Sequence, residues 1–172
     1  MPEQERRGAL INELKIVRKT GLHRLRERID ELPELSKLAT ATMGAGSADD
    51  IERMLRHAFT SYAEGAQGTA IGILFGLEIG RRGARPSVLR EVAAKRLGYD
   101  SVETFRKRPE YNAIAYFADL LHRLAVDANS QKPADVNKID HIMSLITELT
   151  IPEYWELTRR VRQLFAAGSQ MS

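Results

Sequence analysis

Lysine and arginine side chains concentrate in the segment from residue 81 to residue 108, and they could contact phosphate. This segment holds nine lysines and arginines against three acidic residues, whereas the whole chain of 172 residues has a formal net charge of +3. A lysine or arginine that neutralises a nucleic-acid phosphate releases a condensed counterion and strengthens binding. The candidate nucleic-acid contacts are Arg85, Arg90, Lys95, Arg96, Ser101, Arg106, Lys107 and Arg108. An ordinary solvated, arginine-rich face is the alternative.

The elements that must position these side chains are two short helices joined by a turn. Apolar residues recur with the period of a helix, namely Val88, Leu89, Val92, Ala93 and Leu97. Gly98 can adopt positive φ at the end of that helix, and Ser101 is well placed to cap the next one. Phe105 would anchor the second helix in the core, and Pro109 would end it. The spacing predicts a helix-turn-helix over residues 86–108. Arg85, Arg90, Lys95 and Arg96 would then contact the DNA backbone, while Arg106 and Lys107 would reach the groove.

Five residues carry a resemblance to a known family. Ala94, Gly98, Tyr99, Ser101 and Phe105 resemble the second helix-turn-helix of AraC-type regulators, which has an A-x-x-x-G-[YF]-x-S-x-x-x-F arrangement. The resemblance implies that the helix after the serine enters the major groove of DNA. It would direct five residues toward the DNA, namely Asp100, Val102, Glu103, Arg106 and Lys107. The longer stretch from residue 71 to residue 125 is similar to helical modules of actinobacterial proteins of undefined role.

Composition excludes several classes of site. The chain is 43% hydrophobic, which is ample for a core without a metal, and it contains no cysteine. A disulfide framework, a zinc–thiolate site and a thiol nucleophile are therefore excluded, and a reducing cytoplasm is the expected location. No run of about 18 apolar residues is present to span a membrane. The four histidines are scattered without a catalytic or metal-binding spacing, so we expect no enzyme, metal or cofactor; they are His23, His57, His122 and His141.

Apolar stripes spaced by three and four residues predict helices along almost the whole chain. The expected fold is an all-α multi-helix bundle with an embedded helix-turn-helix and a C-terminal helical hairpin. We expect a helical body over residues 1–128, with the helix-turn-helix at 86–108. The hairpin, over 133–168, would pack on the body or on a dimer partner. Residues 1–32 should form one kinked helix or two.

Four glycines spaced by four residues would leave one face of a helix almost without side chains. They are Gly68, Gly72, Gly76 and Gly80. No strand precedes them and no phosphate-binding lysine follows, so the segment lacks the order of a nucleotide-binding loop. Several glycines within a helix destabilise it unless a neighbouring backbone comes close. We therefore interpret these glycines as sites of tight helix packing.

A second group of basic residues lies near the N-terminus, namely Lys15, Arg18, Lys19, His23, Arg24, Arg26 and Arg28. Acidic residues intervene at spacings of three and four, namely Glu13, Glu27, Asp30 and Glu31. Side chains at these spacings meet on a helix surface and can form ion pairs. We therefore favour a solvated, paired face here over an extension of a nucleic-acid site.

The last amphipathic segment, from residue 152, is rich in apolar residues for a position near the chain end. Its candidate partner-binding residues are Tyr154, Trp155, Val161 and Phe165. A homodimer joined here would suit a protein that contacts two half-sites of double-stranded DNA. The sequence thus favours a DNA-binding regulatory protein, and the alternative is a non-enzymatic helical adaptor that binds a protein partner. A small-molecule sensor would require a buried polar cavity.

Overall fold

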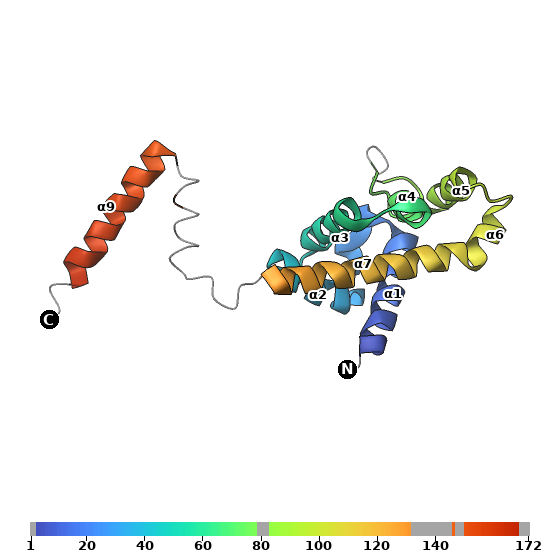
Figure 1. Cartoon of the computed structure of the whole chain (residues 1–172), viewed down its shortest axis with the longest axis horizontal. Coiled ribbons are helices and arrows are strands. Elements are labelled where there is room, and N and C mark those ends of the chain that lie inside the picture. The colour runs from blue at the N-terminus through green and yellow to red at the C-terminus, as the bar shows by residue number, and fades with distance from the viewer. Residues whose placement is uncertain (1–2, 79–82, 132–145, 147–149, 169–172) are drawn as a thin grey trace. The chain divides into compact units, whose positions relative to one another are not determined.

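The computed structural model describes residues 3–78, 83–131, 146 and 150–168. It is all-α, and no strand occurs among the described residues. The chain divides into two compact units, residues 1–131 and residues 132–172. Within the first unit the helices form a multi-helix bundle (Figure 1). The predicted all-α multi-helix bundle is confirmed, and the embedded helix-turn-helix stays a prediction. The first helix of the predicted C-terminal hairpin falls mainly on residues outside the described ranges.

The first half of the bundle contains five helical elements. They are α1 (Glu3–Thr20), the 3-10 helix η1 (Leu22–Glu31), α2 (Pro33–Met43), α3 (Ala48–Tyr62) and α4 (Gly65–Leu74). Gly21, with φ of 88°, separates α1 from η1, so the first 32 residues form two helices, the second with the tighter 3-10 winding. Ser47 and Asp50 form a capping box at the start of α3.

The second half of the bundle contains α5 (Pro86–Arg96), α6 (Val102–Lys107) and α7 (Pro109–Gln131). The long helix α7 packs against α1, α2, α3, α4 and α6, so it lies at the centre of the bundle (Figure 1). Its inward side chains are almost fully buried, among them Ile114, Phe117 and Leu121. The Phe117 ring meets Phe75 edge to face at 4.9 Å between centroids. The core is therefore built around α7.

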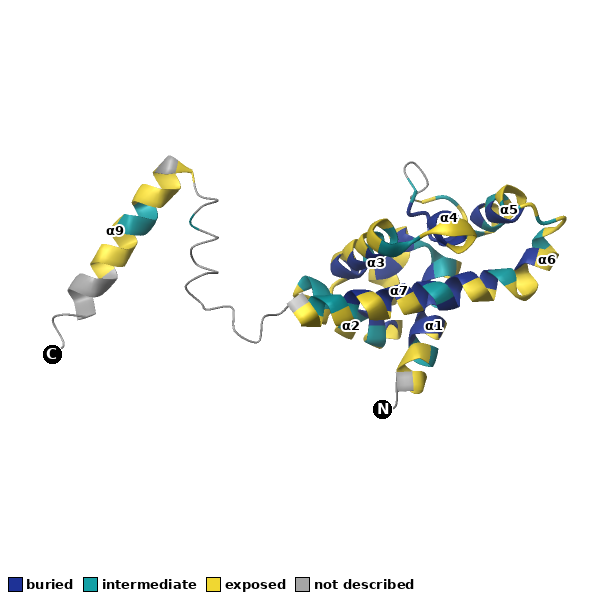
Figure 2. Ribbon diagram, viewed as in Figure 1, coloured by how far each residue is buried: buried dark blue, intermediate teal, exposed yellow. Residues whose placement is uncertain are grey.

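The second unit contributes α9 (Ile151–Gly168). None of its residues whose side chains are described is buried (Figure 2). No helix in the described part of the chain is both long enough and apolar enough to cross a membrane.

Two of the four spaced glycines pack closely, and a third ends a helix. A Cβ on Gly72 would lie 2.8 and 2.9 Å from atoms of the Phe59 ring of α3, and one on Gly68 would lie 3.0 Å from the carbonyl carbon of Ala63. Gly76 instead has φ of 62° in the turn that ends α4, so the predicted continuous glycine face stops there. Tight packing against a neighbouring helix is confirmed at Gly72, whereas the close neighbour of Gly68 is Ala63 in the link before α4, and Gly80 lies outside the described residues.

Replacing Gly72 with alanine should lower the free energy of unfolding by about 2 kcal/mol, because the added methyl overpacks the contact with Phe59. Gly8 on α1 is the matched control, since a Cβ there would meet nothing within 4 Å. Gly8→Ala should raise stability by about 0.5 to 1 kcal/mol through helix propensity. Urea denaturation followed by circular dichroism measures both changes. Equal effects of the two substitutions would contradict the packing interpretation.

Candidate nucleic-acid interface

The turn between α5 and α6 is specified by its backbone hydrogen bonds. The Tyr99 N–H donates to the Ala94 carbonyl at 2.9 Å, and the Gly98 N–H donates to the Lys95 carbonyl at 3.2 Å. Gly98 has φ of 75°, a conformation that favours glycine. These two bonds and the left-handed glycine form a Schellman motif, which satisfies carbonyls at the end of α5. The chain therefore leaves α5 in a defined direction.

The helix α6 begins and is anchored as its sequence predicts. The Ser101 hydroxyl accepts a hydrogen bond from the Thr104 N–H at 3.1 Å. Phe105 is completely buried, and its ring lies 5.3 Å from that of Tyr99. The Ser101 hydroxyl therefore stabilises the start of α6, and this role explains its place in the motif without a contact to DNA.

The expected recognition helix is short, and its acidic residue is already paired. α6 contains six residues, which span about 9 Å at the usual rise of an α-helix. The Arg106 guanidinium lies 3.3 Å from the Glu103 carboxylate. Asp100 is exposed in the turn before it. Of the two side chains expected to reach the groove, Lys107 therefore remains without an acidic partner in the described part of the chain, whereas Arg106 has one.

Arg90 does not lie where a DNA contact would need it. Its Nε and Nη2 atoms donate to the two carboxylate oxygens of Glu110 at 2.9 and 3.1 Å, and its side chain is only 18% exposed. Glu110 is buried at the start of α7. We therefore correct the prediction for Arg90, because this side chain joins α5 to α7.

Arg18 of α1 contacts the same carboxylate. Its Nε lies 2.9 Å from Oε1 of Glu110, but this buried N–H makes no hydrogen bond with acceptable geometry, so the contact is an ion pair. Burial lowers the pKa of the Arg18 guanidinium, Glu110 opposes this effect, and nearby Arg90 and Arg106 add to it. Two guanidinium groups thus share one carboxylate, and the cluster retains one positive charge.

The other predicted basic contacts lie on the surface. Arg85, Lys95, Lys107 and Arg108 are exposed and have no acidic partner among the residues that the structure describes. Arg96 is also exposed, at 3.9 Å from Glu78. The arginines at 81 and 82, which contribute to the charge of the segment, lie outside the described ranges.

Two lysines that the sequence assigned to a paired face join this region. Lys15 Nζ lies 5.2 Å from the centroid of the exposed Tyr111 ring on α7, and Lys19 is exposed one turn further along α1. Neither lysine has an acidic partner in the described chain. Glu13, the nearest acid in sequence, is buried and binds the start of α2 instead. We name the four residues Lys15, Lys19, Lys107 and Arg108 the corner surface.

The predicted pairing does hold further along the N-terminal region. Arg24 pairs with Glu27 at 2.9 Å, and Arg28 pairs with Glu31 at 2.6 Å, both three residues apart on η1. Arg26 instead reaches Asp49 of α3 at 2.7 Å. The interpretation as a solvated, paired face therefore describes η1, whereas Lys15 and Lys19 of α1 are solvated but have no acidic partner in the described chain.

The partner-binding candidates on α9 are exposed. Trp155 is 63% exposed, Tyr154 47% and Val161 39%. The rings of Tyr154 and Trp155 meet edge to face at 6.2 Å between centroids. The side chain of Phe165 lies outside the described residues.

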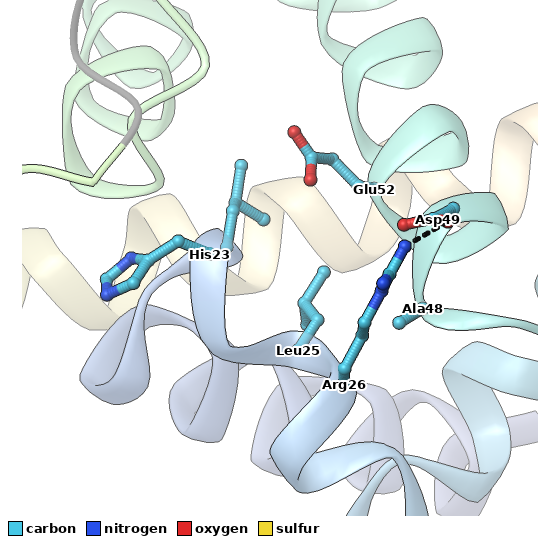
Figure 3. Close-up of a pocket in the computed structure, with 7 residues that line it drawn as sticks. His23, Leu25, Arg26, Ala48, Asp49 and Glu52 are labelled. Atoms are coloured by element: carbon cyan, nitrogen blue, oxygen red, sulfur yellow. Dashed lines mark hydrogen bonds and ion pairs between the residues drawn. The ribbon is translucent and has the colours of Figure 1, made fainter.

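Two of the surface hollows lined by described residues of the bundle are open to solvent. One, of about 330 Å³, lies beside the Arg26–Asp49 ion pair, and the His23 ring points away from that pair (Figure 3). The other, of about 760 Å³, lies between α1, α2 and α7. Within the described ranges no three His, Asp or Glu side chains are grouped to hold a metal ion. The buried polar cavity that a small-molecule sensor would require is not among these hollows.

Comparison of the chain with protein-family models, with curated proteins and with solved structures gives no match. The resemblance to AraC-type regulators therefore stays a prediction from five residues.

Proposed function

We propose that the bundle of residues 3–131 is a regulatory DNA-binding module that contacts the phosphates of double-stranded DNA through the corner surface. The observation that carries this proposal is the convergence of four exposed cations from two distant segments. The Lys15–Tyr111 contact and the Arg18–Glu110 ion pair hold α1 against the start of α7, directly after Lys107 and Arg108. None of the four cations is neutralised by an acid in the described chain.

The buried cluster of Arg18, Arg90 and Glu110 adds to the positive potential of the corner surface. Arg18 and Arg90 share the single carboxylate of Glu110, so one positive charge remains behind the exposed lysines. Such a charge is screened less than a fully solvated one, because the protein interior has a low dielectric constant. Phosphate is the complementary ligand for such a potential. The short α6, with its Glu103–Arg106 pair, favours backbone contacts over reading of base edges.

Replacing Lys107 and Arg108 together with alanine should weaken binding to random-sequence duplex DNA and reduce the salt dependence. Each phosphate contact contributes about −0.9 to the slope of log K against log salt concentration, so the slope should become less steep by about two. Fluorescence anisotropy of a labelled duplex across a salt series measures this slope. Lys15→Ala with Lys19→Ala should give a similar change, which a site confined to α5 and α6 does not predict.

The matched control is Arg24→Ala with Arg28→Ala, which removes two cations that are already paired on η1. This variant has the same net charge as the test variants and should keep the original slope. Equal slopes for all three double variants would show that only net charge matters, and the proposed contacts would then be wrong. Absence of binding at low salt by the folded protein would contradict DNA binding as a whole.

The second candidate function is that of a helical adaptor for a protein partner, and the exposure of Trp155, Tyr154 and Val161 on α9 favours it. On this alternative the corner surface is solvated or meets an acidic partner. A chain that ends at Thr150 should lose association with the partner and keep any salt-dependent DNA binding. A truncated chain that keeps its association with the partner but loses DNA binding would contradict the adaptor role of α9.

A further inference from the structure

The helix α9 presents an apolar face that its own sequence does not cover. Tyr154, Leu157 and Val161 recur at three and four residues along one side, and Trp155 flanks them. In proteins, an amphipathic helix gains most of its stability by packing such a face. The described side chains of this face are half-exposed or exposed (Figure 2). The face therefore requires an occupant.

Charges along α9 are segregated by sign. Glu153 and Glu156 lie near the start of the helix, and they are followed by Arg159, Arg160 and Arg162. Glu153 and Arg160 are seven residues apart, so they occupy the same edge of the apolar face. Two α9 helices packed in parallel would place arginines beside arginines. Two packed antiparallel would place Glu153 of each copy near Arg160 of the other, giving two equivalent ion pairs.

We propose that α9 binds α9 of a second copy of this chain, antiparallel, through Tyr154, Leu157 and Val161. Glu153, which also accepts hydrogen bonds from Thr150, and Arg160, which also binds Glu156, would pair across the interface. The occupant is a second copy because this one helix supplies both halves of a self-complementary contact: an apolar stripe and an edge with opposite charges at its two ends. An anionic membrane fits less well, since Glu156 already binds Arg159 and Arg160, both at 2.8 Å, and the polar face is of mixed charge. The proposal is independent of DNA binding.

The test is the mass of the full chain by sedimentation equilibrium over a range of concentrations. The wild type should form a dimer, and Val161→Glu should abolish it at the same concentrations because it places a carboxylate in the apolar contact. Gln163→Glu, which adds a carboxylate on the polar side of the same helix, is the matched control and should leave the dimer intact. A monomeric wild type, or a dimer that Val161→Glu leaves unchanged, overturns the proposal.

Reversing the charges of Glu153 and Arg160 tests whether the two α9 helices pack antiparallel. Glu153→Arg and Arg160→Glu each place like charges together twice in the dimer, and each should weaken it about tenfold. The double variant restores opposite charges only in the antiparallel arrangement, so it should recover most of the lost affinity. If both single variants weaken the dimer and the double variant does not recover it, the antiparallel arrangement is overturned. A monomeric chain that binds anionic phosphatidylserine vesicles through Trp155 overturns self-association in favour of a lipid surface.

Discussion

Replacing Glu110 with alanine is expected to lower the free energy of unfolding by about 4 kcal/mol, the effect of removing one partner from a buried ion pair. The carboxylate is 7% exposed and lies within 3.1 Å of two guanidinium groups, those of Arg18 and Arg90, which are 14% and 18% exposed. Its loss leaves two poorly solvated cations facing each other and disconnects α1 and α5 from α7. Urea denaturation should be followed by circular dichroism, because the single tryptophan lies in α9.

Asp119 provides the matched control on the same helix. Its carboxylate binds Arg7 of α1 with Nε–Oδ1 and Nη2–Oδ2 distances of 2.6 and 3.0 Å, but the two side chains are 52% and 46% exposed. Asp119→Ala should therefore cost less than about 1 kcal/mol, as exposed ion pairs usually do. Both substitutions remove a carboxylate that binds an arginine through two hydrogen bonds, so their difference reports burial together with the second arginine at Glu110. Equal losses of stability for the two would show that the Glu110 cluster has no special role.

Local signals explain why much of the fold could be predicted from sequence. Pro33 at the first turn and Gly44 after the last fix the bounds of α2, which extends from Pro33 to Met43. Ser47 with Asp50, and Gly98 with Ser101, act through hydrogen bonds to backbone groups within four residues. Such signals need no knowledge of tertiary contacts, and the helix ends that depend on them are therefore predictable.

The candidate site was less predictable because the state of a charge depends on partners distant in sequence. Arg90 and Lys107 are equally basic in sequence, yet the fold places Arg90 on Glu110, 20 residues away, and leaves Lys107 in solvent. Lys15 could not be assigned to the corner surface either, because its neighbour Tyr111 follows it by 96 residues. Spacing could suggest that Glu13 pairs with a nearby cation, but only the fold shows its actual partners.

The partners of the Glu13 carboxylate are two backbone amides at the start of α2. The Glu13 carboxylate accepts hydrogen bonds from the Glu34 N–H at 2.9 Å and from the Leu35 N–H at 2.8 Å. Glu13 is only 6% exposed, so it satisfies two otherwise free amides of a helix N-terminus from within the bundle. The same bonds fix α2 against α1. One side chain therefore acts both as a helix cap and as a tertiary contact.

Glu13→Ala should lower the free energy of unfolding by about 3 kcal/mol, because it leaves the buried Leu35 amide and the half-buried Glu34 amide without acceptors. Glu13→Gln should cost less, since the amide oxygen can still accept one of the bonds. Glu5→Ala, which removes an exposed glutamate from the same helix, should have little effect and is the control. Thermal or urea denaturation compares the three variants. A loss for Glu13→Ala no larger than that for Glu5→Ala would contradict the capping role.

The Glu13→Gln variant also tests a pH dependence. Burial raises the pKa of Glu13 above its ordinary value of 4.5, although the bonds from Leu35 and Glu34 lower it. A carboxyl group with a raised pKa binds its proton more tightly in the folded protein, so its contribution to stability is complete below pH 4.5 and falls as the pH rises through the folded-state pKa. The stability advantage of the wild type over Glu13→Gln should therefore be largest in acid and shrink toward neutral pH. A difference that grows with pH would mean that the backbone hydrogen bonds outweigh burial at this carboxylate.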